Sequence, residues 1–281
     1  MKARKSQRKA GSKPNLIQSK LQVNNGSKSN KIVKCDKCEM SYSSTSIEDR
    51  AIHEKYHTLQ LQGRKWSPNW GSIVYTERNH SKTVHLSRST GTITPLNSSP
   101  LKKSSPSITH QEEKIVYVRP DKSNGEVRAM TEIMTLVNNE LNAPHDENVI
   151  WNSTTEEKGK AFVYIRNDRA VGIIIIENLY GGNGKTSSRG RWMVYDSRRL
   201  VQNVYPDFKI GISRIWVCRT ARKLGIATKL IDVARENIVY GEVIPRYQVA
   251  WSQPTDSGGK LASKYNGIMH KSGKLLLPVY I

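Results

Sequence analysis

A strand, a basic turn and an amphipathic helix follow one another late in the chain, and this unit constrains the fold most. Ile212–Val217 reads as a strand, Arg222, Lys223 and Gly225 form the turn, and residues 225–239 carry apolar side chains at helical spacing. Amide N–H groups at a helix N-terminus attract anions, and a glycine lets the backbone approach a phosphate. The unit therefore predicts a phosphate-binding turn, although it matches neither the P-loop nor the dinucleotide fingerprint. The alternative is an ordinary helix start after a core strand.

Apolar segments from residue 112 onward predict a mixed α/β domain. The pair Asn167-Asp168 is typical of a tight hairpin, and residues 212–252 form a strand–loop–helix–strand unit. The predicted strands are 115–118, 161–165, 171–176, 192–194, 212–217, 249–251 and 275–281, and the predicted helices are 126–141 and 225–239. Strands outnumber helices, and the segment is long enough for one core.

Two cysteines and two histidines lie close together nearer the N-terminus. Two residues separate Cys35 from Cys38, and three separate His53 from His57, so both imidazoles would lie on one helix face. Two thiolates and two imidazoles suit a closed, structural zinc site, the alternative being a chance cluster. The predicted finger helix, Ser46–Tyr56, carries acids as well as bases, so we expect the finger to be structural or protein-binding rather than a DNA reader.

Positive charge is concentrated at the N-terminus. The net charge is +21, and the first 34 residues contain ten Lys or Arg and no Asp or Glu. Such a tail is typical of a nuclear address, a contact with DNA or chromatin, or both, and a merely soluble cationic tail is the alternative. No apolar run is long enough for a membrane span, no secretory signal is expected, and three cysteines do not indicate a disulfide scaffold.

These patterns divide the chain into four parts. We expect a disordered basic tail over residues 1–31, a zinc finger over 32–61, a Ser/Pro-rich linker over 62–111 and the α/β domain over 112–281. Four Ser/Thr-Pro pairs in the linker region are candidate phosphorylation sites that would add negative charge to a basic segment. They are Ser67, Thr94, Ser99 and Ser105. An unmodified linker is the alternative.

Several segments around the turn together carry a more specific pattern. They are Ser213-Arg214-Ile215-Trp216-Val217, Arg222-Lys223-Leu224-Gly225-Ile226-Ala227, Asn237-x-x-Tyr240-Gly241, Ala250-x-Ser252-x-Pro254-Thr255 and Gly259-Lys260-Leu261. The turn resembles the pyrophosphate loop of the GNAT superfamily of N-acetyltransferases. Together the segments resemble the cohesin acetyltransferases that establish sister-chromatid cohesion, a family that also has one zinc finger and a basic tail before its acetyltransferase domain. The resemblance covers residues 33–60 and 112–281.

The resemblance implies a fold and an activity. The fold would be GNAT-type α/β, a mixed central sheet flanked by helices, preceded by a small ββα-like finger. The activity would be nuclear lysine N-acetylation of the ATPase-head subunit of cohesin during DNA replication, with acetyl-CoA as co-substrate and autoacetylation as a further reaction. Gln18-x-x-Leu21 is a partial match to the peptide that binds the replication sliding clamp. A chromatin-binding adaptor with an inactive acetyltransferase-like fold and a histone acetyltransferase are the alternatives.

The family also implies roles for individual residues. Main-chain groups of the strand would hold pantetheine and the acetyl oxygen, and the turn would hold the pyrophosphate. The expected acetyl-CoA-binding residues are Ile215, Trp216, Val217, Arg222, Lys223, Leu224, Gly225, Ile226, Ala227, Thr228 and Thr255, and the expected substrate-binding residues are Ser252, Gln253 and Lys260.

Asp232 is the expected catalytic base, the alternative being a solvated helix carboxylate, and Ser213 is a candidate hydrogen-bonding relay. The family often has an aspartate where this chain has Gln253, and an amide cannot accept the proton as a base. A mechanism that rests on that carboxylate therefore does not transfer to this chain.

Overall fold

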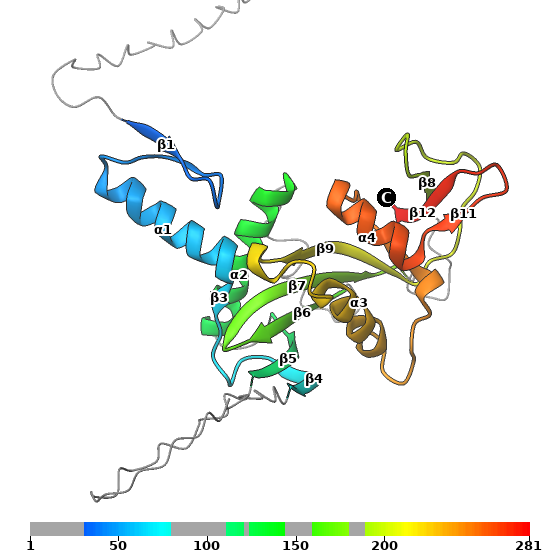
Figure 1. The fold of residues 1–281 in the computed structure, drawn as a ribbon. Coiled ribbons are helices and arrows are strands. Elements are labelled where there is room, and N and C mark those ends of the chain that lie inside the picture. The colour runs from blue at the N-terminus through cyan, green and yellow to red at the C-terminus, as the bar shows by residue number, and fades with distance from the viewer. Residues whose placement is uncertain (1–30, 80–110, 121–123, 144–158, 180–188) are drawn as a thin grey trace, which may run out of the picture.

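One mixed sheet of ten strands organises the described part of the chain (Figure 1). The structure, a computed structural model, describes residues 31–79, 111–120, 124–143, 159–179 and 189–281. The strands of this sheet are β3 (Arg64–Lys65), β4 (Ser72–Asn79), β5 (Gln111–Val118), β6 (Gly159–Arg166), β7 (Arg169–Asn178), β8 (Gly190–Val194), β9 (Ile210–Val217), β10 (Val249–Trp251), β11 (Ile268–Met269) and β12 (Leu275–Tyr280). Their main order is β11-β12-β10-β9-β7-β6-β5-β4, with β3 added to β7 and β8 added to β12.

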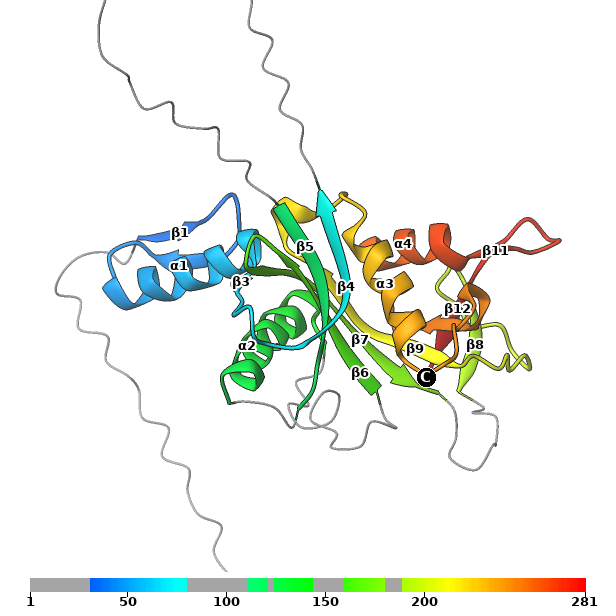
Figure 2. The same ribbon diagram turned by 90° about the horizontal axis from the view of Figure 1, so that it is seen from below.

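Helices cover both faces of the sheet. α2 (Asn124–Leu141) and α3 (Ile226–Asn237) lie on opposite faces (Figure 2), and α4 (Asp256–Asn266) packs near β12. Because β7 lies between these helices, its run Ile173–Ile176 is buried throughout instead of alternating between core and solvent.

The hairpin between β6 and β7 has the turn that its sequence predicts. Asn167 and Asp168 have φ values of 51° and 55°, the left-handed pair that a two-residue type I′ turn requires and that Asn and Asp tolerate. The turn fixes the register of the two central antiparallel strands.

β9 separates from its neighbour half-way along its length. It pairs in parallel with β10 from Ile210 to Ile212, and the last pair joins Ile212 to Trp251, but β9 continues to Val217. On its other edge β9 stays paired with β7 up to Val217, apart from a bulge that leaves Ser213 as the extra residue. The main-chain groups that face the β10 side after Ser213 are therefore not paired with β10.

The zinc-finger region is a small unit beside the sheet. β1 (Ile32–Lys34) and β2 (Ser41–Ser43) form an antiparallel pair, and α1 (Ile47–Gln62) follows, capped by the Ser46 hydroxyl, which accepts a hydrogen bond from the Asp49 N–H. The helix is longer than the predicted Ser46–Tyr56 and continues into β3.

The predicted linker over residues 62–111 is wrong for residues 64–79. That stretch contains β3, which pairs with β7, and β4, which pairs with β5. Trp66 lies between them, is 3% exposed and makes an edge-to-face contact with Trp70. The sheet therefore takes up chain that directly follows the finger helix, and residues 80–110 lie outside the described ranges. Among the described residues, no helix has both the length and the apolar character for a membrane crossing.

Candidate active site and zinc centre

The basic turn leaves the N-terminus of α3 open. After β9 comes a short 3-10 helix, η1 (Arg219–Ala221), and then the turn itself. Gly225 is the residue before α3, with φ 80° and no side-chain cap, and a Cβ built on it would meet nothing within 4 Å. A glycine is therefore needed at position 225 because the backbone is left-handed there, and not because of close packing. No side chain caps the first N–H groups of α3, which suits an anion.

The side chains of the turn divide into two groups. Lys223 and Leu224 are exposed, whereas Ile226 is buried and ties the start of α3 to the core. Arg222 points back toward the domain: its Nε donates to the Val217 carbonyl at 2.8 Å, and its guanidinium pairs with Glu140 of α2. The turn thus presents main-chain N–H groups and the Lys223 ammonium, while the Arg222 charge is already paired.

Two serines meet where β9 and β10 separate. The Ser252 hydroxyl donates to the Ser213 carbonyl at 3.0 Å, just beyond the last β9–β10 pair. Ser213 is 6% exposed, and Arg214 donates to its carbonyl and hydroxyl oxygens. The structure therefore brings the predicted relay Ser213 and the predicted substrate residue Ser252 together at the opening of the sheet.

Asp232 lies at the centre of a cationic network on α3. Its carboxylate accepts hydrogen bonds from the Tyr265 hydroxyl at 2.7 Å, from Arg235 Nε at 3.1 Å and from Arg246 at 3.1 Å. Partial burial acts to raise the pKa of this carboxyl, but the bonds from Tyr265 and Arg235 and the charge of Arg246 outweigh it and hold the pKa below its ordinary value. A carboxylate with a low pKa and occupied lone pairs is a weak proton acceptor. The base role of Asp232 stays a prediction, which this geometry does not favour.

The remaining predicted substrate and cofactor residues lie at the start of α4. Gln253 and Lys260 are exposed. The Thr255 hydroxyl caps α4 by accepting a hydrogen bond from the Gly258 N–H at 3.2 Å, which gives it a structural use. Arg198 holds the segment by donating to the Pro254 carbonyl and to Asp256, contacts that sequence reasoning missed.

The four predicted zinc ligands converge on one point. One ligand atom from each of Cys35, Cys38, His53 and His57 lies within 4.8 Å of the others. His53 Nε2 is buried and has no hydrogen-bond partner, and its ring stacks on Tyr42 at 4.0 Å. A buried imidazole nitrogen without a proton partner fits a metal ligand.

The Cys35 thiol suits the same ion. A hydrogen bond from the Cys38 backbone N–H, opposed by desolvation and aided by His53, lowers the pKa of the Cys35 thiol to about 6. A thiol that ionises this readily is a ready zinc ligand. The residues present therefore fit tetrahedral zinc, with Cys35, Cys38, His53 and His57 holding it and with no open position for catalysis.

The finger is bonded to the segment that leads into the turn. Arg219 of η1 donates to the Lys37 carbonyl and to Glu39 at 3.0 Å each, and Thr220 donates to the Leu61 carbonyl at 2.6 Å. Lys37 and Glu39 flank Cys38 in the knuckle. The zinc knuckle therefore contacts chain that lies three residues before Arg222.

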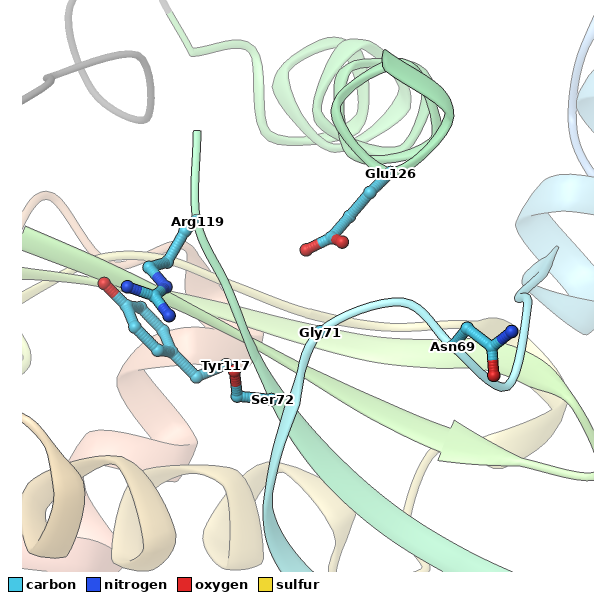
Figure 3. Close-up of a pocket in the computed structure, with 6 residues that line it drawn as sticks. All are labelled: Asn69, Gly71, Ser72, Tyr117, Arg119 and Glu126. Carbon is cyan, nitrogen blue, oxygen red and sulfur yellow. The ribbon is translucent and has the colours of Figure 1, made fainter. Parts of the chain in front are cut away.

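A polar pocket lies apart from these predicted residues, between the start of β4, the end of β5 and the first turn of α2 (Figure 3). Glu126 extends from α2 toward the loop that contains Gly71, and Arg119 and Tyr117 lie beside it. The pocket is lined by Asn69, Gly71, Ser72, Tyr117, Arg119 and Glu126. None of the residues predicted to bind cofactor or substrate lines it.

Comparison with known proteins places the chain in a family. A family model described as ESCO1/2 acetyl-transferase matches residues 207–271, and one described as the zinc-finger of acetyl-transferase ESCO matches residues 18–59. N-acetyltransferase ECO1 of Saccharomyces cerevisiae is 99% identical over 281 residues, which is 100% of both chains. The chain belongs to the ECO1/ESCO N-acetyltransferase family.

More distant members match over most of their length. N-acetyltransferase ECO1 of Candida glabrata is 46% identical over 95% of this chain and 94% of its own. A solved xEco2 acetyltransferase domain bound to a CoA conjugate is 26% identical, covers 60% of this chain and 91% of that chain, and has a TM-score of 0.46. The ECO1/ESCO family confirms the predicted N-acetyltransferase activity and the predicted zinc finger.

Proposed function

We propose that this N-acetyltransferase transfers acetyl from acetyl-CoA to lysine on the ATPase-head subunit of cohesin, in the nucleus, during DNA replication. One observation carries the acetyl-CoA part. Beyond Ile212, β9 has an edge that β10 does not pair, and the uncapped N-terminus of α3 follows β9 after η1 and the turn. The free edge of β9 offers main-chain groups to the amide-containing pantetheine arm, and the uncapped start of α3 offers N–H groups to the pyrophosphate.

The residues would divide the ligand between them. Main-chain groups of the segment Ile215–Val217 would bind pantetheine, because alternate residues of β9 direct their N–H and C=O away from β7. The Val217 carbonyl already accepts from Arg222 Nε at 2.8 Å, which leaves the other outward-facing groups. The N–H groups from Gly225 to Thr228 would receive the pyrophosphate, with Lys223 adding charge. Bound acetyl-CoA supplies the activated acetyl group.

The acceptor lysine must lose a proton before it can attack. An ordinary lysine has a pKa of about 10.4, so deprotonation near neutral pH costs roughly 4 to 5 kcal/mol. Asp232 is the carboxylate that we propose for this step, acting through water after substrate binding displaces one of the partners that lower its pKa. Ser213 and Ser252 would orient the path. Gln253 and Lys260, exposed at the start of α4, would contact the protein substrate.

Reaction with defined substrates tests this proposal. Purified zinc-loaded chain is incubated with acetyl-CoA and either cohesin or nucleosomes, and acetyl-lysine is located by mass spectrometry. We expect acetylation of the cohesin head subunit, together with some modification of the enzyme itself. Acetylation of histones alone would contradict the substrate assignment, and no acetylation by a folded, zinc-loaded chain would favour an adaptor.

The tail and linker extend the proposal to regulation. The basic tail would contact DNA or chromatin and the segment with Gln18 and Leu21 would contact the sliding clamp; both lie outside the described residues, as do Thr94, Ser99 and Ser105. Ser67 is described: it is half-buried, and its carbonyl accepts the Trp70 N–H at 3.1 Å. Phosphorylation of Ser67 and of the other three sites is part of the proposal.

A further inference from the structure

One carboxylate on α2 joins the strand and the turn of the acetyl-CoA site. Glu140 Oε2 accepts a hydrogen bond from the Trp216 indole N–H at 2.7 Å, and Glu140 Oε1 pairs with the Arg222 guanidinium. The Glu140 side chain is 18% exposed, and Trp216 is 4% exposed. Both oxygens are thus used, one for each side of the site.

The turn has few other anchors. Among the described residues, the main chain from Arg219 to Leu224 makes only the short-range bonds of η1, Ala221 N–H to Cys218 and Arg222 N–H to Arg219. Leu224 is 57% exposed, so apolar packing does not hold this part of the turn. Arg219 and Thr220 bond η1 to the finger and to the end of α1. Among the described residues that follow η1 in the turn, Arg222 is the side chain that bonds back to the sheet and to α2, through Val217 and Glu140.

We propose that Glu140 is a positioning residue for acetyl-CoA: it holds Arg222 against β9 and so fixes the direction in which the turn presents the N-terminus of α3. The inference rests on the proposed acetyl-CoA site. Glu140 does not touch the ligand in this scheme. Its contribution is to keep the turn in the binding conformation before the ligand arrives, which removes part of the ordering cost of binding.

A purely electrostatic role and a positioning role of Glu140 predict opposite changes in acetyl-CoA affinity when Glu140 is neutralised. Glu140 places a negative charge near a site for a polyanion, so its neutralisation would strengthen binding if only long-range electrostatics mattered. Loss of positioning would weaken binding, because Arg222 would be released and the turn would sample other conformations. Glu140→Gln removes the charge and keeps an amide oxygen that can still accept the indole N–H.

Calorimetric titration of acetyl-CoA into the full chain decides between the two. We expect Glu140→Gln to raise Kd about tenfold, the size of one lost charge-assisted hydrogen bond, and to raise the KM for acetyl-CoA while the KM for the acceptor lysine is unchanged. Glu132→Gln is the matched control: it removes the same charge from the same helix, where Glu132 pairs with Arg64 and Arg128. Its Kd should stay within twofold of wild type.

A double-mutant comparison identifies the partner. If Glu140 acts through Arg222, then Glu140→Gln adds little to the loss in an Arg222→Ala background. Equal or tighter binding by Glu140→Gln would overturn the inference while leaving the acetyl-CoA site intact. Absence of binding by the wild-type chain would overturn both. Full additivity of the two substitutions would also reject the proposed action of Glu140 through Arg222, because it would mean that the two residues act separately.

Discussion

Gly211, the second residue of β9, is predicted to tolerate no side chain. It pairs with Glu177 of β7 and Ala250 of β10, so its backbone is fixed on both edges. A Cβ at this position would lie 2.5, 2.7 and 2.9 Å from Cε1, Cζ and Cδ1 of Tyr280. Carbon atoms in contact prefer about 3.5 to 4.0 Å, so Gly211→Ala requires a shift of about 1 Å.

The Tyr280 ring has little freedom to make that shift. It is 5% exposed, its hydroxyl donates to Glu177 at 3.1 Å, and the Arg189 guanidinium lies 5.0 Å from its ring centre. Overpacking of a well-packed core costs about 1 to 3 kcal/mol, and the restrained ring places Gly211→Ala near the upper end. For a chain of this size, about 3 kcal/mol corresponds to a Tm lower by about 6 to 12 °C.

Thermal unfolding of the full chain measures this effect. Gly258→Ala is the control, because its Cβ would make ordinary contacts of 3.4 Å with Thr255 and 3.5 Å with Pro254 inside α4, and alanine favours a helix. The Gly211→Ala penalty should also shrink in a Tyr280→Ala background, where the crowding is gone. A Tm within about 2 °C of wild type for Gly211→Ala would refute the reasoning.

Three further predictions concern zinc, Asp232 and the finger contact. Removing zinc with a strong chelator, or by Cys38→Ser, should unfold the finger and speed amide exchange over residues 219–222, measured by hydrogen exchange; unchanged exchange there would show that the finger does not brace the turn. Asp232→Asn should lower the free energy of unfolding by about 1 to 2 kcal/mol at neutral pH, because Arg235 and Arg246 lose their shared partner. Because the pKa of Asp232 is lowered in the folded state, its stabilisation is present above the unfolded pKa of about 3.9 and is lost as the pH falls through the folded value. Denaturant melts should therefore show the free energies of unfolding of wild type and Asp232→Asn converging in acid. A constant difference between them down to low pH would contradict this. Glu39→Gln should weaken the hold on Arg219 and lower the Tm by at most a few degrees, since Glu39 is 60% exposed; a larger loss would assign the pair a greater role than its exposure allows.

The sequence predicted those parts of the fold that depend on local pattern. The unit β9–α3–β10 follows from apolar periodicity and a glycine turn, and the zinc ligands follow from spacing within one short segment. β4 escaped prediction because its stability comes from pairing with β5, across a stretch of Ser, Pro and Asn that is typical of a linker. α4 escaped because Gly258 and Gly259 lower its helix propensity, which the Thr255 cap and the buried Ala262 and Tyr265 offset.

The hydrogen-bond and ion-pair partners of the site residues were harder to predict than the site residues themselves. Glu140 meets Trp216 and Arg222 across 76 and 82 residues of chain, and no local pattern signals such a contact. The same holds for Asp232: its place on the helix face was predictable, but its partners Arg246 and Tyr265 come from η2 (Arg246–Gln248) and α4. These distant groups decide whether a carboxylate is a base or an anchor.

We propose that the turn before α3 binds acetyl-CoA, and calorimetry with one pair of variants tests this binding. Gly225 and Gly273 both have positive φ, 80° and 75°, and a Cβ at either would meet nothing within 4 Å. Gly225→Asp and Gly273→Asp therefore carry the same backbone strain and the same added charge, but only the first lies at the proposed pyrophosphate site. We expect that Gly225→Asp abolishes measurable acetyl-CoA binding and that Gly273→Asp binds like wild type. Equal affinity of the two variants would contradict it.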